Sequence, residues 1–209
     1  MRVVSLGFLS IGIFILIQVI LPIASFQIWS IGQKLNNQVL ISPIKSKKGV
    51  LGISVQNRSN FPAFVSDLIR ETKSNYSEFQ LSVPKLKIEG ETVYVDSNDL
   101  SKGLSQLPGS ALPGEKGNVF ISGHSALNRF FPGQKAIFAR LMDLKKGDEI
   151  VVGAGSTKFV YRVAEIKVVD PSDLSVIPAP DEQGRYISLM TCVPPGLNFK
   201  RLVVLGKMI

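Results

Sequence analysis

The hydrophobic and polar positions along this chain form two different patterns, and the first is a long apolar run near the N-terminus. No charged residue occurs over positions 3–33, and within Leu6–Ala24 only Ser10 and Gln18 are clearly polar. These 19 residues come close to the ~20 that cross a ~30 Å hydrocarbon core. A cleaved signal peptide has a shorter apolar region of about 7–15 residues. The pattern therefore favours an uncleaved transmembrane helix over residues 1–31.

The charges that flank this segment do not specify its orientation. Arg2 precedes it, whereas four lysines follow it: Lys34, Lys45, Lys47 and Lys48. The positive-inside rule alone would therefore favour an external N-terminus. We expect the opposite orientation, with a cytoplasmic N-terminus and an external C-terminal domain, because of the chemistry described below.

Residues 32–77 are expected to form a stalk and a docking helix. The stretch 42–49 is polar and contains proline and glycine, so it is not expected to join a core. A helix is predicted from about Pro62 to Ser74, with Asn60 as its N-cap. Its apolar stripe at helical spacing comprises Phe64, Val65, Leu68 and Ile69.

From Phe79 onward the second pattern begins, with short apolar or alternating runs separated by glycine and proline turns. Strands are predicted over residues 79–83, 93–95, 119–121, 149–152, 159–163, 166–169, 186–190 and 201–205. Helical segments are predicted near residues 99–107 and 136–144. About eight short strands favour a mainly β fold, a closed eight-stranded β-barrel over residues 78–209 with a few short helices.

Composition limits the chemistry that this chain can perform. It has one cysteine, so no intramolecular disulfide can form, and one histidine, so a Cys/His zinc site with about four ligands is excluded. The net charge is +8, from 24 Lys and Arg against 16 Asp and Glu. The basic residues are scattered among acidic ones and form no nucleic-acid-binding motif, so nucleic acid is not an expected partner.

The strongest chemical signal lies near the C-terminus. An apolar strand ends at Cys192, the chain turns through residues 194–196 (Pro-Pro-Gly), and a second apolar strand begins at Arg201. If the two strands pair, Cys192 and Arg201 face each other at one end of the sheet. A fixed positive charge favours the nucleophilic thiolate. An arginine also stays protonated, so it can donate hydrogen bonds to an oxyanion.

The single histidine, His124, also follows a short apolar strand, with Gly123 before it allowing a close backbone approach. An imidazole near a cysteine suits acyl transfer, since it can protonate a leaving amine and deprotonate an incoming one. Taken singly, a cysteine on a strand is usually a small core residue. The combination of Cys192, His124 and Arg201 is what indicates a catalytic site.

These motifs resemble the sortase family over about residues 78–208. The TLxTC box of that family appears as residues 188–192 (Ser-Leu-Met-Thr-Cys), with serine at its first position. The family's histidine falls on His124 and its arginine on Arg201. The Pro-Pro-Gly sequence after the cysteine resembles sortases of class D or E more than those of class A or B.

The resemblance implies a cysteine transpeptidase of the external cell-membrane surface. Cys192 would attack an LPxTG-like sorting signal in a secreted protein, and an amine would resolve the thioester. That amine would come from a peptidoglycan precursor or a pilin lysine. Thr191 is expected to contact substrate or oxyanion, with strand packing as the alternative, and no metal or organic cofactor is implied. Tyr161 and Phe130 are expected to pack in the core rather than to line a peptide groove.

Two other interpretations remain. One is a wall-peptide acyl-transferase of the L,D-transpeptidase kind, although the Ser-x-Gly-Cys neighbourhood of those enzymes is absent around Cys192. The other is a membrane-tethered β-barrel that binds a ligand without turnover. An intact set of Cys192, His124 and Arg201 argues against the second.

Overall fold

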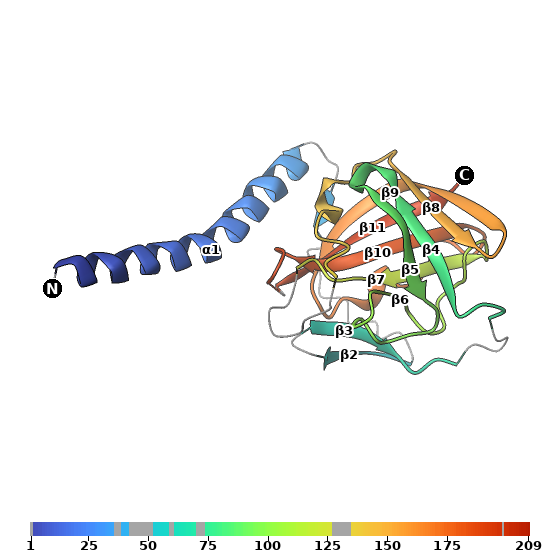
Figure 1. Ribbon diagram of the computed structural model, residues 1–209. Helices are drawn as coiled ribbons and strands as arrows, with labels where there is room; N and C mark the ends of the chain where they lie inside the picture. Colours follow the sequence, from blue (N-terminus) through green and yellow to red (C-terminus); the bar gives the residue numbers. More distant parts are fainter. Residues whose placement is uncertain are drawn as a thin grey trace.

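In the computed structural model, a long helix precedes a set of strands that close into a β-barrel (Figure 1). The structure describes residues 2–35, 39–41, 52–58, 61–69, 74–126, 135–197 and 199–209. The helix is α1 (Arg2–Leu35). The strands are β1 (Val39–Ile41), β2 (Ile53–Arg58), β3 (Phe61–Ser66), β4 (Glu78–Val83), β5 (Ile88–Tyr94), β6 (Leu104–Gln106), β7 (Gly117–Ser122), β8 (Glu149–Ala154), β9 (Thr157–Val169), β10 (Arg185–Val193) and β11 (Lys200–Met208). The short 3₁₀ turns are η1 (Pro84–Leu86), η2 (Leu141–Asp143) and η3 (Leu174–Val176).

The barrel closes because the long strand β9 pairs along both of its edges. The sheet order is β1-β9-β11-β10-β7-β6-β5-β4-β8, and β8 also pairs with β9. Strands β4 to β11 therefore form a ring of eight, and β1 adds to β9 outside that ring. The closed eight-stranded barrel predicted from the sequence is confirmed. Its interior is filled by apolar side chains from these strands, since inward positions alternate with exposed ones, as along β4.

The pattern predicted two strands, 159–163 and 166–169, where the structure has the single strand β9. Core-facing positions of β9 are odd-numbered up to Val163 and even-numbered from Ile166, so the alternation changes phase. The register with β11 shifts at the same place, as in a β-bulge. The change of phase marks a bulge and not the end of a strand.

The helix predicted near residues 99–107 is wrong, because this segment contains β6, which pairs with β5 and β7. All three residues of β6 are buried, so the period-two alternation that would indicate a strand is missing. The helix predicted near residues 136–144 is reduced to turns and η2. Three of its apolar side chains are fully buried all the same, those of Phe138, Leu141 and Leu144, and Ile137 is partly buried.

The helix predicted over residues 62–74 is wrong for its first half, which forms β3 and pairs antiparallel with β2. Phe64 and Val65 are buried, and each packs on a different part of the barrel. A strand allows this because it directs neighbouring side chains to opposite sides. Ile69 is 93% exposed, so the apolar stripe does not continue. Residues 70–73 lie outside the described part of the chain.

The segment between helix and barrel is partly built into the sheet. Strand β1 lies parallel to β9, with Val39 opposite Ile166. The polar stretch 42–49, predicted as stalk, lies outside the described residues. The division of the chain at residues 31 and 77 therefore stays a prediction.

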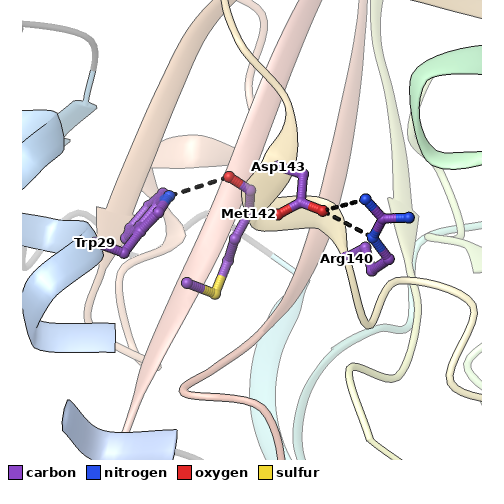
Figure 2. Close-up of polar contacts among 4 residues, drawn as sticks. All are labelled: Trp29, Arg140, Met142 and Asp143. Atoms are coloured by element: carbon purple, nitrogen blue, oxygen red, sulfur yellow. Dashed lines mark hydrogen bonds and ion pairs between the residues drawn. The ribbon is translucent and has the colours of Figure 1, made fainter. Parts of the chain in front are cut away.

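Helix α1 reaches the barrel with its C-terminal part. It contains Pro22, which removes a helix hydrogen bond, and it bends along its length (Figure 1). Beyond the proline, Phe26 and Trp29 pack against the apolar core cluster of the barrel. The Trp29 Nε1–H donates to the Met142 carbonyl at 3.1 Å, next to the ion pair between Arg140 and Asp143 (Figure 2). This contact joins the helix to η2.

Candidate active site

The candidate catalytic residues lie on the outer face of the central strands β7, β10 and β11. Along β10, Leu189 and Val193 belong to the barrel interior, whereas Met190 belongs to a second cluster outside it. Because side chains alternate, Cys192 shares the outer face with Met190. By the same rule Arg201 shares the outer face of β11 with Val203, which lies in that second cluster.

Cys192 and Arg201 are direct register partners in the antiparallel pair of β10 and β11. The predicted placement of these two residues opposite each other is therefore confirmed. Both side chains are buried, with Cys192 2% exposed and Arg201 0% exposed. The Arg201 Nη1–H donates to the Lys200 carbonyl at 3.0 Å, which directs part of the guanidinium toward the backbone.

The two groups influence each other's ionisation. Burial raises the pKa of the Cys192 thiol to about 11, and the charge of Arg201 opposes this rise. Burial likewise lowers the pKa of Arg201, and the charge interaction with Cys192 raises it. Desolvation thus outweighs the attraction, and the thiol is neutral at pH 7 in this arrangement.

His124 follows the end of β7, which runs parallel to β10 with Ser122 opposite Met190. The pairing continues one residue further, because the Gly123 N–H donates to the Met190 carbonyl at 3.1 Å. This places the histidine at the same end of the sheet as Cys192. Burial lowers the pKa of His124, and a hydrogen bond to the backbone of Leu100 opposes that effect. Burial therefore favours the neutral form of the imidazole over the charged form.

Thr191 does not face the same way as its neighbour. It is 1% exposed, and its Oγ1–H donates to the Gly123 carbonyl at 2.8 Å. The hydroxyl is thus engaged with the β7 end rather than with the outer face. Tyr161 is fully buried in the core, as predicted, and Phe130 lies outside the described residues.

The outer face at Cys192 is covered by the pair of strands β2 and β3. Val65 and Cys192 form one buried apolar cluster, with Leu100 packed against it. The cover is held by two reciprocal hydrogen bonds, from the Ser66 N–H to Asn98 Oδ1 at 3.2 Å and from Asn98 Nδ2 to the Ser66 carbonyl at 3.1 Å. In this arrangement the thiol is closed off from solvent.

A buried polar link supports the same face further along the strands. Asn118 Nδ2 donates to the Ser188 hydroxyl at 2.9 Å and to the Ile177 carbonyl at 2.8 Å. It thereby joins β7, β10 and the loop that contains η3. Neither this link nor the covering role of Val65 was predicted from the sequence. The one local signal was a polar residue, Asn118, directly before the apolar run of residues 119–121.

No three His, Cys, Asp or Glu side chains lie close enough to hold a metal ion, as far as the described residues go. The polar groups near Cys192 are instead an imidazole and a guanidinium, which suit proton transfer and anion stabilisation. The site is thus defined by a closed β-barrel that carries a thiol, a guanidinium and an imidazole at one end of its sheet.

Comparison with known proteins names the family. The model of the sortase domain matches residues 81–209, and the chain belongs to the sortase family. This match favours a sortase over the L,D-transpeptidase interpretation.

Individual relatives agree with this assignment. Sortase D of Bacillus subtilis (strain 168) is 32% identical over 131 residues, which are 61% of this chain and 61% of that protein. The matched region thus spans about three fifths of the relative's length. Among solved structures, a lid mutant of sortase A from Corynebacterium diphtheriae superposes with a TM-score of 0.57 at 30% identity, covering 66% of this chain and 72% of that one. A Clostridium perfringens sortase D5 transpeptidase gives a TM-score of 0.55 at 25% identity, with 66% and 82% covered.

Proposed function

We propose that this chain is a membrane-anchored cysteine transpeptidase that cleaves an LPxTG-like sorting signal and transfers the acyl group to an amine. The observation that carries the proposal is the direct pairing of Cys192 with Arg201, beside the strand end that bears His124. These three groups supply a nucleophile, an anion stabiliser and a proton carrier.

The acylation step begins from neutral groups. His124 takes the proton of the Cys192 thiol, and the Sγ attacks the backbone carbonyl carbon of the signal. The oxyanion that forms is stabilised by the Arg201 guanidinium. When the C–N bond breaks, His124 gives its proton to the leaving amine and a thioester remains on Cys192.

Resolution of the thioester reverses these roles. An incoming amine attacks the thioester carbonyl and loses a proton to His124, while Arg201 again stabilises the oxyanion. The C–S bond then breaks, and the thiol is regenerated when His124 returns the proton. A neutral resting pair suits this cycle, because burial raises the pKa of Cys192 and lowers that of His124.

The substrates follow from the family. One similar solved structure is a Clostridium perfringens sortase C with a C-terminal cell wall sorting motif, and another, Streptococcus pneumoniae sortase C, is described in terms of pilin substrate specificity. We therefore propose a sorting-signal protein as acyl donor and a peptidoglycan precursor or a pilin lysine as acceptor. Thr191 has its hydroxyl engaged elsewhere, so it is not included among the proposed substrate contacts.

The anchor belongs to the same proposal. Phe8–Gly32 of α1 is long and apolar enough to cross a membrane. The N-terminus would lie in the cytoplasm and residues 78–209 outside the cell, where sorting signals and wall precursors occur. The contacts of Phe26 and Trp29 with the barrel would keep the catalytic domain next to the bilayer.

Intact mass spectrometry tests the activity. The full chain in detergent micelles is incubated with LPxTG-like peptides and hydroxylamine, with the Cys192→Ala variant as control. A thioacyl adduct on Cys192 and a hydroxamate product are expected for the wild type, and neither for the variant. If a small alkylating reagent modifies Cys192 while no peptide acylates it, the transpeptidase proposal is wrong and a binding role is favoured.

A further inference from the structure

Thr191 and Cys192 are neighbours in the sequence but face opposite sides of strand β10. Cys192 contacts Val65 and Leu100 on the outer face. Thr191 has the parity of Leu189 and Val193, which lie in the barrel interior. A peptide lying over the thiol is therefore separated from the Thr191 hydroxyl by the strand itself.

The Thr191 hydroxyl instead holds the backbone that leads into His124. Its Oγ1–H donates to the Gly123 carbonyl at 2.8 Å, in a fully buried contact. The Gly123 N–H donates to the Met190 carbonyl at 3.1 Å. Both polar backbone groups of Gly123 are thus bound to the two residues that precede Cys192.

The residue between β7 and the histidine has to be glycine for steric reasons. A Cβ at Gly123 would lie 2.5 Å from Leu104 Cδ2 and 2.7 Å from Phe138 Cδ2. Glycine, however, is the residue with the most backbone freedom, so it would leave the following side chain poorly fixed. A hydrogen bond to its carbonyl restricts that freedom at the position where it matters for His124.

A further backbone contact completes the arrangement. The Phe138 N–H donates to the His124 carbonyl at 3.0 Å. Hydrogen bonds from Thr191 and Phe138 therefore fix the carbonyls on the two sides of the His124 Cα. The imidazole position is then set by β10 and by the segment before η2.

We propose that Thr191 is a positioning residue, which orients His124 by holding the Gly123 carbonyl and does not contact the substrate. Its catalytic consequence rests on the proposed transpeptidase function. A displacement of about 1 Å in a catalytic group can cost ~10²-fold in rate. Thr191→Val keeps the shape and removes the donor, so it should lower the acylation rate by about 10- to 100-fold. The peptide KM should change little, and Thr191→Ser should restore most of the rate.

The first test needs no turnover. His124 is the only histidine of the chain, so histidine labelled with ¹³C and ¹⁵N gives a single set of ring signals in NMR spectra. Spectra of the full chain in lipid nanodiscs are recorded from pH 5 to 9 for the wild type, Thr191→Val and Thr191→Ser. The valine variant should shift or broaden the ring signals and change their titration, whereas the serine variant should match the wild type. Unchanged ring signals in Thr191→Val would overturn the proposal.

The second test is a double-mutant cycle on acylation, read as the rate of peptide cleavage with hydroxylamine. If Thr191 acts through His124, then Thr191→Val should have little further effect in a His124→Ala background. An equal fold-loss in both backgrounds would mean that Thr191 acts on the substrate or on Cys192, which contradicts the proposal. Thr92→Val on β5 is the matched control, since it makes the same change in a strand away from the site.

Two controls keep the outcomes distinct. If the valine variant fails to fold, shown by its thermal midpoint, Thr191→Ala and Thr191→Ser are compared in its place, and equal ring spectra for these two would contradict the proposal. If the wild type shows no acyl transfer, the proposed function fails, while the NMR comparison still decides the positioning role.

Discussion

The two faces of the central strands β7, β10 and β11 are built from the same backbone but are closed in different ways. The inner face is apolar and is covered by the rest of the barrel. The outer face carries Cys192, Arg201 and, at its end, His124, and its cover consists of β3 and the loop with η3. Closing the barrel fixes the inner face permanently. Among the described residues, the segments that cover the outer face do not belong to the ring of eight strands, so the ring itself does not hold this cover in place.

The largest effect is expected from a substitution that removes the charged group of the outer face, the Arg201 guanidinium. Arg201→Ala should lower the acylation rate by ~10²–10³-fold, the cost of removing an oxyanion donor. Arg201→Lys should recover little of it, because the planar guanidinium is lost. The measurement is the single-turnover acylation rate with a saturating peptide. A loss below tenfold would remove Arg201 from this role.

A pair of adjacent substitutions compares the two faces directly. Leu189 and Met190 are both fully buried, but they point to the inner and the outer face. Leu189→Ala should reduce the free energy of unfolding by about 2–5 kcal/mol, and Met190→Ala should fall at the low end of that range. The loop with η3 and strand β3 can move into the space left by the Met190 side chain. The closed barrel cannot move in the same way into the space left by Leu189. Chemical denaturation measures both, and equal losses would contradict the distinction.

Because the pKa of Cys192 is raised, its contribution to the free energy of unfolding should depend on pH. A thiol whose pKa is higher in the folded chain than in the unfolded chain favours folding while it is protonated. This contribution is complete below the unfolded pKa of about 8.5 and is lost as pH rises through the folded pKa of about 11. The difference in unfolding free energy between the wild type and Cys192→Ala should therefore decrease above pH 9. A difference that is constant from pH 7 to 10.5 would contradict the burial of a neutral thiol.

The smallest expected effect concerns the cover. Asn98→Ala removes both side-chain hydrogen bonds to Ser66, each worth about 0.5–1.5 kcal/mol net. The population with an accessible thiol should rise, so the rate of Cys192 alkylation by iodoacetamide at pH 8 should increase several-fold. Gln80→Ala, an exposed change on β4, should leave that rate unchanged. Equal rates for wild type and Asn98→Ala would mean that these bonds do not control access.

The sequence predicted those parts of the fold in which local alternation and burial agree. Strands such as β4 alternate regularly, and the pairing of Cys192 with Arg201 followed from two apolar strands joined as a hairpin with a long loop. Prediction from the sequence failed where burial comes from contacts with residues distant in the sequence. β6 is buried at every position, and β3 owes its burial to the barrel face on which it lies.

By itself the sequence limited the proposed nucleophile and proton carrier to one candidate each, since the chain has one cysteine, Cys192, and one histidine, His124. The expectation from the sequence was that Thr191 contacts substrate or oxyanion, whereas the structure directs its hydroxyl to the Gly123 carbonyl, on the other side of the strand from Cys192. Only the tertiary structure decided which side is the interior and that Val65 lies on the thiol. The reason is that alternation is a local property of the backbone, whereas barrel closure and the cover depend on contacts between residues far apart in the sequence, such as Leu81 with Val152 and Val65 with Cys192.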